Sequence, residues 1–171
     1  LNDEKLKPYF KLENVIQGAF TVAENLFELS FVEVKNIETW HEDVKTYEVK
    51  NKRKELVSIF YTDFHPREEK ENGAWANSLN NQRVKNGKNI RPHVINICNF
   101  TKPTDSLPSL LTFHEVTTLF HEFGHGLHGM LANTTYPSLS GTNVYWDFVE
   151  LPSQVLENWC YEKECLEIFA K

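Results

Sequence analysis

The chain has 171 residues, about the length of one domain, and 40% of them are hydrophobic, which allows an ordinary soluble globular core. The net charge of −6 argues against a nucleic-acid partner, because nucleic-acid-binding domains usually carry a basic patch. No apolar run approaches the roughly 18 residues of a membrane span, and no signal-peptide pattern opens the sequence.

The three cysteines, Cys98, Cys160 and Cys165, are odd in number and show no C-x-x-C pairing. This usage indicates buried, reduced thiols in a cytoplasmic protein. The sequence begins at Leu1, not at Met, and ends at Lys171 inside an expected helix. We therefore expect residues 1–171 to form a single unit within a longer protein.

The first half of the chain predicts one helix followed by several strands. Apolar residues recur at helical spacing over residues 10–29, which indicates an amphipathic helix. Stretches rich in β-forming residues predict strands at 31–34, 44–49, 56–64 and 94–100. Residues 66–73 and 80–89 are polar and read as loops, the second with the alternative of a hairpin turn, and a short strand at 74–76 lies between them.

The second half predicts two helices. Prolines break the chain over 103–108, and Thr112 with Glu115 fits a capping box that begins a helix running to about Leu131. After a loop, a second helical stretch is expected over residues 149–170. One helix, several strands and two helices predict an α+β domain with the helices packed on one face of a mixed sheet.

The first of these two helices carries a metal-binding pattern. His121-Glu122-Phe123-Gly124-His125 matches H-E-x-x-H, in which residues i and i+4 project from one helix face toward one ion. The apolar stripe occupies the opposite face, so we expect the histidines to face a cleft. Neutral imidazoles suit Zn²⁺. Glu122 can lie beside the ion without binding it, within reach of a water on the metal.

A catalytic zinc needs a third protein ligand and one open position. The longer pattern H-E-x-x-H-x-x-G-x-x-H fails here, because His128 stands where Gly is required and Leu131 where His is required. Glu150, 25 residues after His125 at the start of the next expected helix, is the preferred third ligand. Spacing alone leaves Asp147 and Glu157 as competitors.

Residues around the metal site have supporting roles in this interpretation. His128, Gln154 and Glu157 are expected to pack against the ligands or to hydrogen-bond a ligand imidazole. Gly124, Gly126 and Gly129 weaken the helix by roughly 1 kcal/mol each against Ala, so we expect them to permit close approach of a neighbouring segment or of substrate. Trp75 has two equal readings, as a core aromatic or as a substrate contact.

HEFGHGLH followed by DFVELPSQVLENW resembles the zinc peptidase family of thimet oligopeptidase, oligopeptidase A and dipeptidyl carboxypeptidase. Shorter matches in the same order extend the resemblance over nearly the whole chain. They are PYFKL at residue 8, WHEDV at 40, FYTD at 60, PR at 66, GAW at 73, CNF at 98 and SGTN at 140. The LSGTN run is most similar to the dipeptidyl carboxypeptidase branch.

The resemblance implies a zincin-like catalytic subdomain in which His121, His125 and Glu150 bind one Zn²⁺ per chain and Glu122 is the general base and acid. It also implies that Gly73, Ala74 and Trp75 belong to an edge strand that pairs with the substrate backbone. Short peptides are the implied substrates, cut near the C-terminus if the carboxypeptidase-like branch is right.

The chain departs from the family in length. Family members are several times longer, with a large helical N-terminal portion. They also use a histidine and tyrosines, from a Gly-rich stretch beyond the point where this sequence stops, to steady the tetrahedral intermediate. We therefore expect the rest of a longer peptidase chain as a partner. The alternative function is a zinc-binding module that is catalytically incomplete or purely structural.

Overall fold

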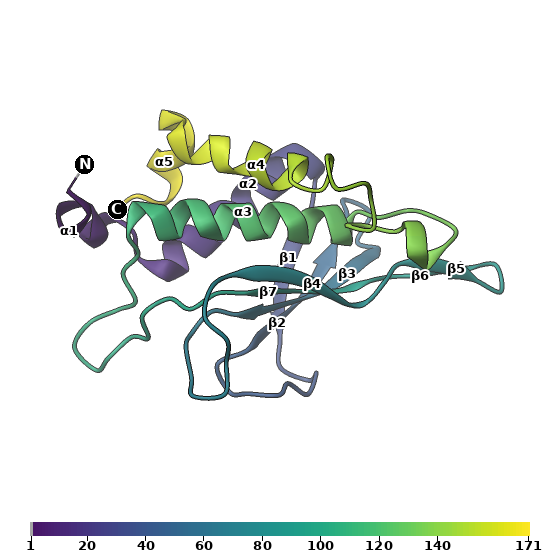
Figure 1. The fold of residues 1–171 in the computed structure, drawn as a ribbon, viewed down its shortest axis with the longest axis horizontal. Coiled ribbons are helices and arrows are strands. Elements are labelled where there is room, and N and C mark those ends of the chain that lie inside the picture. Colours follow the sequence, from purple (N-terminus) through teal and green to yellow (C-terminus); the bar gives the residue numbers. More distant parts are fainter. Residues whose placement is uncertain (1) are drawn as a thin grey trace.

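The computed structural model describes residues 2–171 and shows a sheet covered on one face by helices (Figure 1). The α-helices are α1 (Asp3–Leu6), α2 (Leu12–Phe27), α3 (Phe113–Met130), α4 (Leu151–Asn158) and α5 (Lys163–Phe169). The strands are β1 (Ser30–Val34), β2 (Lys45–Lys50), β3 (Leu56–Asp63), β4 (Trp75–Asn80), β5 (Arg83–Lys85), β6 (Lys88–Ile90) and β7 (His93–Ile97). Short 3-10 turns at Lys7–Tyr9, Pro137–Leu139 and Trp159–Tyr161 complete the elements. The α+β prediction is confirmed.

The main sheet has the order β1-β2-β3-β7-β4. It is mixed, as predicted, because β3 and β7 run parallel while the other neighbouring pairs are antiparallel. Among residues 2–171, β4 pairs with β7 alone and is therefore an edge strand, which confirms the edge expected around residue 75. Residues 80–89 contribute to a separate hairpin, β5-β6, whose turn places Asn86 and Gly87 at positive φ, the backbone that two-residue hairpin turns need.

The hydrophobic core lies between the helices and the sheet. The ring of Phe123 on α3 has its centroid 5.8 Å from those of Phe20 on α2 and Phe60 on β3, so two helices and a strand meet at one aromatic cluster. The opposite sheet face buries a smaller cluster of Val44, Ile59, Tyr61 and Ile95. Because the larger core sits on the helix side, α3 is held against the sheet along its apolar stripe.

Both ends of α3 are fixed by side chains. At its start, the Thr112 hydroxyl accepts from the Glu115 backbone amide while the Glu115 carboxylate accepts from the Thr112 amide, so the predicted capping box is confirmed. At its end, the Arg91 guanidinium donates to the carbonyls of Met130 and Ala132 at 2.8 and 3.1 Å. These contacts satisfy helix-terminal groups that would otherwise lack partners.

The predicted single helix over 149–170 is wrong, because the chain breaks between α4 and α5. Trp159–Tyr161 tightens into a 3-10 turn and Glu162 is extended, with φ −86° and ψ 129°. The break turns α5 onto α2, where fully buried Phe169 lies against Gly18 so closely that an added Cβ would meet its ring at 2.6 Å. Burial of Phe169 outweighs the local preference for one continuous helix.

All three cysteines are buried and free of disulfides, as expected. Within residues 2–171, none of the helices combines the length and the apolarity that a membrane crossing requires.

Candidate metal centre

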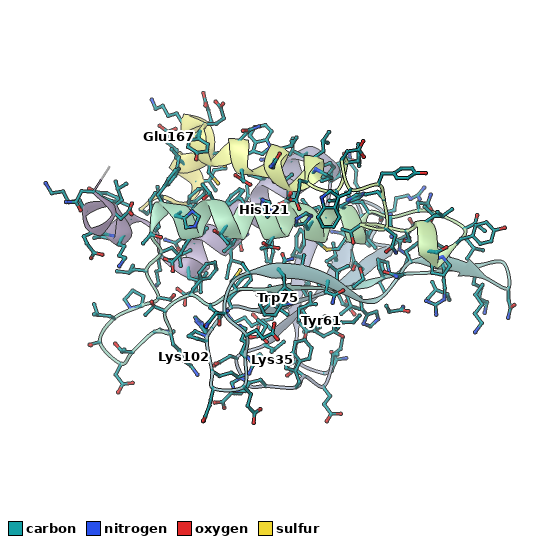
Figure 2. All side chains as sticks on the ribbon, in the orientation of Figure 1. Lys35, Tyr61, Trp75, Lys102, His121 and Glu167 are labelled. Carbon is teal, nitrogen blue, oxygen red and sulfur yellow. The ribbon has the colours of Figure 1, made fainter. Side chains whose placement is uncertain are left out.

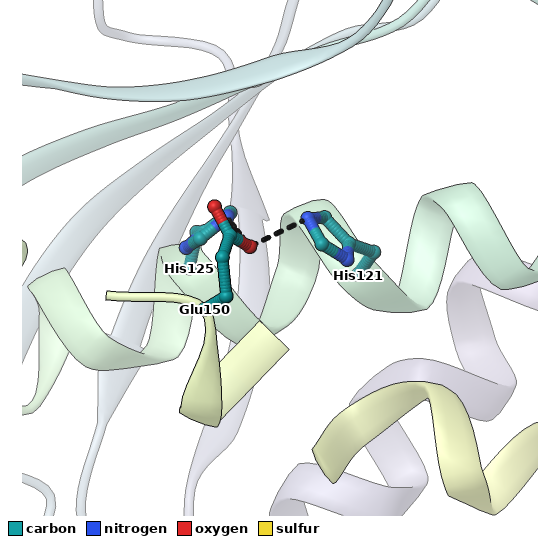
Figure 3. Close-up of side chains that lie close together, drawn as sticks. All are labelled: His121, His125 and Glu150. Atoms are coloured by element: carbon teal, nitrogen blue, oxygen red, sulfur yellow. Dashed lines mark ion pairs between the residues drawn. The ribbon is translucent and has the colours of Figure 1, made fainter. Parts of the chain in front are cut away.

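Three potential metal ligands converge between α3 and the start of α4 (Figure 3). The Nε2 atoms of His121 and His125 lie 3.2 and 3.1 Å from Oε2 of Glu150, and the ligand atoms of the three residues all lie within 4.8 Å of one another. His121 and His125 share a face because they are one helical turn apart. Glu150 reaches them as the residue that immediately precedes α4, with Pro152 in the first turn.

Of the sequence candidates for a third ligand, Glu150 is the one that joins the histidines. Asp147 is exposed and does not belong to the group, and among residues 2–171 no further set of three such side chains converges. Glu157 instead accepts a hydrogen bond from Nδ1 of His121 at 2.5 Å. This contact places the proton on Nδ1 and leaves the Nε2 lone pair of His121 directed toward Glu150.

Ser153 is a supporting residue that the sequence interpretation missed. Its hydroxyl donates to Oε2 of Glu150 at 2.7 Å and to the Glu150 carbonyl at 2.9 Å. This hydrogen bond, with the neighbouring histidines, lowers the pKa of Glu150 and keeps its carboxylate ionised. The signal was available, since a serine three residues after an acid at a helix start is positioned to bond back to it.

We expect Glu157→Ala to weaken metal binding by roughly 10–100-fold, the usual effect of losing a hydrogen-bond partner of a ligand imidazole. The His121 ring would be free to rotate and to change tautomer. Isothermal titration with zinc would measure the change. Glu167→Ala on α5 is a matched control and should leave the affinity unaltered, because the ion pair of Glu167 is with Lys163. Equal affinities in the two variants would contradict the orienting role.

Glu122 lies beside the three convergent groups but is not one of them. Its side chain is buried, at 6% exposure, and Oε2 has no hydrogen-bond partner among residues 2–171. Burial raises the pKa of Glu122 to about 7, opposed by the charge of His121 and reinforced by that of Glu150. A carboxyl group with a pKa near neutrality can both accept and return a proton in that pH range.

Gly124 allows α4 to approach α3 closely enough for Glu150 to reach the histidines. A Cβ at this position would lie 2.6 Å from Cα of Ser153 and 2.7 Å from the carbonyl oxygen of Pro152. Both are backbone atoms, so no change of side-chain rotamer could relieve the clash. Gly126 and Gly129 face the sheet instead, where a Cβ would meet Asn96 at 3.3 Å and Val94 at 3.1 Å. The predicted reason for these glycines, close approach of neighbouring segments, agrees with this packing.

Gly124→Ala should therefore displace the start of α4 and lower zinc affinity by at least about tenfold, since a misplaced Glu150 leaves two good ligands. Gly126→Ala is the control, because it gives the helix the same gain in propensity but meets only side-chain atoms of Asn96. Its zinc affinity should stay close to that of the parent. Retention of full affinity in both variants would show that α4 adjusts without cost.

The edge strand β4 runs beside α3, and its side chains alternate between the two sheet faces. Ser78 faces the helix, because its hydroxyl lies 3.5 Å from the position that a Cβ added to Gly129 would occupy. Ala74 packs against the main core. Trp75 pairs with Ile97, which belongs to the opposite face. In Figure 2, Trp75 lies with Tyr61 on the side of the sheet away from His121. Its side chain is thus directed away from the candidate metal centre.

The start of β4 is held by Asn99, a second residue that sequence reasoning missed. Its amide nitrogen donates to the carbonyls of Glu71 and Gly73 at 2.9 and 2.8 Å. Gly73 has φ +100°, a conformation that side chains rarely allow. Asn99 belongs to the CNF match at residue 98, but the local sequence could not predict its role. Its partners, Gly73 and Glu71, are 26 and 28 residues away along the chain.

Two other residues that we expected to support the ligands, His128 and Gln154, form no hydrogen bond with His121 or His125 within residues 2–171. His128 is half-buried, its ring 6.2 Å from that of Phe148, and its Nδ1 has no partner within residues 2–171. Burial lowers the pKa of His128 and favours the neutral imidazole. The Gln154 side chain is exposed and forms no hydrogen bond with residues 2–171, so Glu157 alone of the predicted partners touches a ligand imidazole.

The chain is similar to several known peptidases over nearly its whole length. Oligopeptidase A of Haemophilus influenzae is 44% identical over 168 residues, which cover 97% of this chain and 25% of the relative. Dipeptidyl carboxypeptidase of Salmonella typhimurium is 43% identical over 172 residues, covering 100% and 25%. Thimet-like oligopeptidase of Dictyostelium discoideum is 42% identical over 170 residues, covering 97% and 25%. The chain spans about a quarter of the length of these relatives.

The profile of peptidase family M3 matches residues 1–171. Because the match extends over the whole chain and these relatives share the region that contains the converging histidines and glutamate, the chain belongs to peptidase family M3.

Proposed function

We propose that the chain is the catalytic subdomain of a zinc-dependent peptidase that hydrolyses short peptides. The observation that carries the proposal is the convergence of His121, His125 and Glu150 beside a buried Glu122. Two imidazoles and a carboxylate form a ligand set typical of catalytic zinc. Ligands about 2.0–2.2 Å from a tetrahedral ion lie roughly 3.3–3.6 Å apart, close to the 3.1 and 3.2 Å between Glu150 and the histidines.

In the proposed mechanism, His121, His125 and Glu150 hold the ion, and Glu157 and Ser153 keep two of these ligands in orientation. A bound zinc lowers the pKa of water from about 15.7 toward 7 and polarises the scissile carbonyl. Glu122 accepts the proton of the attacking water and returns it to the leaving amine, which is the role its raised pKa suits. Such a HExxH arrangement on α3, packed against a mixed sheet, supports the zincin-like assignment.

The peptide substrate would lie along β4, whose outer edge can pair with an extended backbone. Gly73 and Ala74 precede the strand and Trp75 begins it, so these residues would offer backbone groups. Identities of 44% and 43% to oligopeptidase A and dipeptidyl carboxypeptidase favour neither specificity, and removal of C-terminal dipeptides stays our prediction from the LSGTN run.

We further propose that the remainder of a longer peptidase chain packs beside this subdomain, in the cytoplasm. Tyr145 and Trp146, a few residues before Glu150, are 89% and 92% exposed, an unusual state for adjacent aromatic side chains. Residues elsewhere in a longer protein would supply the groups that steady the tetrahedral intermediate.

Metal analysis together with a peptide assay tests the proposed function. The purified chain should bind one zinc per molecule, and the complete natural protein should cleave a short peptide in a zinc-dependent reaction. A matched peptide with an amidated C-terminus separates the two specificities, since a dipeptidyl carboxypeptidase needs the free carboxylate. Stoichiometric zinc without hydrolysis by the complete protein would instead support the structural-module alternative, in which the fourth coordination position is closed.

A further inference from the structure

One buried polar contact joins the sheet to the proposed catalytic helix. Asn96 on β7 is 1% exposed, and its side-chain Nδ2 lies 2.8 Å from the backbone carbonyl oxygen of Glu122. A carbonyl oxygen only accepts hydrogen bonds, so the amide nitrogen of Asn96 must face it. A buried amide is costly unless it is bonded, and this bond is made to the residue that we assign as the base.

The packing around Asn96 is shaped to admit the amide. A Cβ on Gly126 would lie 3.3 Å from both Nδ2 and Oδ1 of Asn96, which is tighter than ordinary contact. Gly126 is thus the position at which α3 makes room for the amide. One helical turn on, Gly129 faces Val94 of the same strand. Since Asn96 lies over Gly126 and Val94 over Gly129, α3 runs antiparallel to β7 with two glycines along the contact.

Asn96 also contacts the edge strand β4. Asn96 pairs in register with Ala76 of β4, the strand along which we place the substrate backbone. One residue therefore touches the element that would hold the peptide and the element that would hold the base and two metal ligands. We propose that Asn96 is a positioning residue that fixes the separation of α3 from β4 and so aligns the scissile carbonyl with Glu122. This proposal rests on the proposed function.

The expected consequence is a loss of kcat with little change in KM or in zinc binding. If Asn96 loses its bond, the peptide still pairs with β4, and His121, His125 and Glu150 still converge, because α4 packs on α3 through Gly124 and not through Asn96. Only the relation between peptide and base would change. A misplacement of about 1 Å can lower the rate by roughly 100-fold.

The test compares Asn96→Leu with Val94→Ala in the complete natural protein. Leucine has the same number of side-chain heavy atoms and the same branching as asparagine but cannot donate to Glu122, whereas Val94→Ala disturbs the packing of the same strand on the same helix without removing a polar contact. We expect Asn96→Leu to lower kcat by roughly 10–100-fold beyond the control. KM, the zinc dissociation constant and inhibition by acetohydroxamate, which binds by chelating the metal, should stay within about threefold of the parent values.

Gly126→Ala serves as a second variant should Asn96→Leu fail to fold, and it should show the same pattern because its Cβ displaces the amide. Equal loss of kcat in Asn96→Leu and Val94→Ala would overturn the proposal, since Asn96 would then act only through stability. A parallel loss of zinc affinity would overturn it as well. A parent protein without zinc-dependent hydrolysis would refute the proposed function itself, which is a distinct outcome.

Discussion

Glu122→Gln is expected to reduce kcat by about 10³-fold or more while zinc remains bound at one ion per chain. General acid–base catalysis commonly contributes 10²–10⁴-fold, and the amide of glutamine has the shape of the carboxyl group without its basicity. Zinc should be retained because Glu122 is not among the three convergent groups. Metal content measured beside steady-state kinetics on one short peptide would separate binding from chemistry.

The stability of the Glu122→Gln variant should equal or exceed that of the parent above pH 7. The pKa of Glu122 is raised by burial, so the ionised form is less favourable in the folded chain than in the unfolded chain. Loss of that charge relieves the penalty where the carboxylate would be ionised. Glu115→Gln is the matched control, because glutamine also serves in a capping box and the residue lies on the same helix. Activity surviving in Glu122→Gln would remove Glu122 from the reaction.

His121→Ala is expected to abolish both zinc binding and hydrolysis. Two protein ligands hold zinc poorly, and the loss should exceed the roughly 10–100-fold caused by losing an outer hydrogen-bond partner. The variant would also leave the Glu157 carboxylate without its 2.5 Å partner. Equilibrium dialysis with zinc, followed by circular dichroism, would distinguish loss of the metal from loss of the fold.

His114→Ala provides the comparison for His121→Ala. His114 lies on the same helix and is exposed, and its side chain forms no hydrogen bond with residues 2–171. Its removal should leave zinc stoichiometry and kcat/KM unchanged. The two variants should therefore be inactive for different reasons. Glu122→Gln should be inactive although zinc is bound, and His121→Ala should be inactive because zinc is lost. Stoichiometric zinc in His121→Ala would show that the ligand set is wrong.

Local patterns in the sequence determined the features that depend on neighbouring residues. The four-residue spacing of His121 and His125 places both imidazoles on one helix face, whatever the rest of the chain does. Thr112 and Glu115 define the start of that helix for the same reason, and Gly87 after Asn86 is typical of a tight hairpin turn. Interactions over a few residues are encoded by their spacing alone.

The tertiary structure decided the features that depend on how elements pack. Spacing could not show which of Glu150, Asp147 and Glu157 lies beside the two histidines, because the position of Glu150 depends on the close approach of α4 to Gly124 of α3. The register of β4 against β7 turned the side chain of Trp75 away from the metal centre. These outcomes follow from burial and steric fit between segments far apart in the chain, which no local period records.

Long-range packing also broke the expected helix over 149–170. We expected that helix to continue through Glu162, yet the chain turns there so that Phe169 can be buried against α2. Asn96 is the clearest case of the same kind. In the sequence it is one polar residue inside a strand, and only the fold brings its amide to the carbonyl of Glu122, 26 residues away. The two histidines belong to a local motif, but the contact between Asn96 and Glu122 forms only in the folded chain.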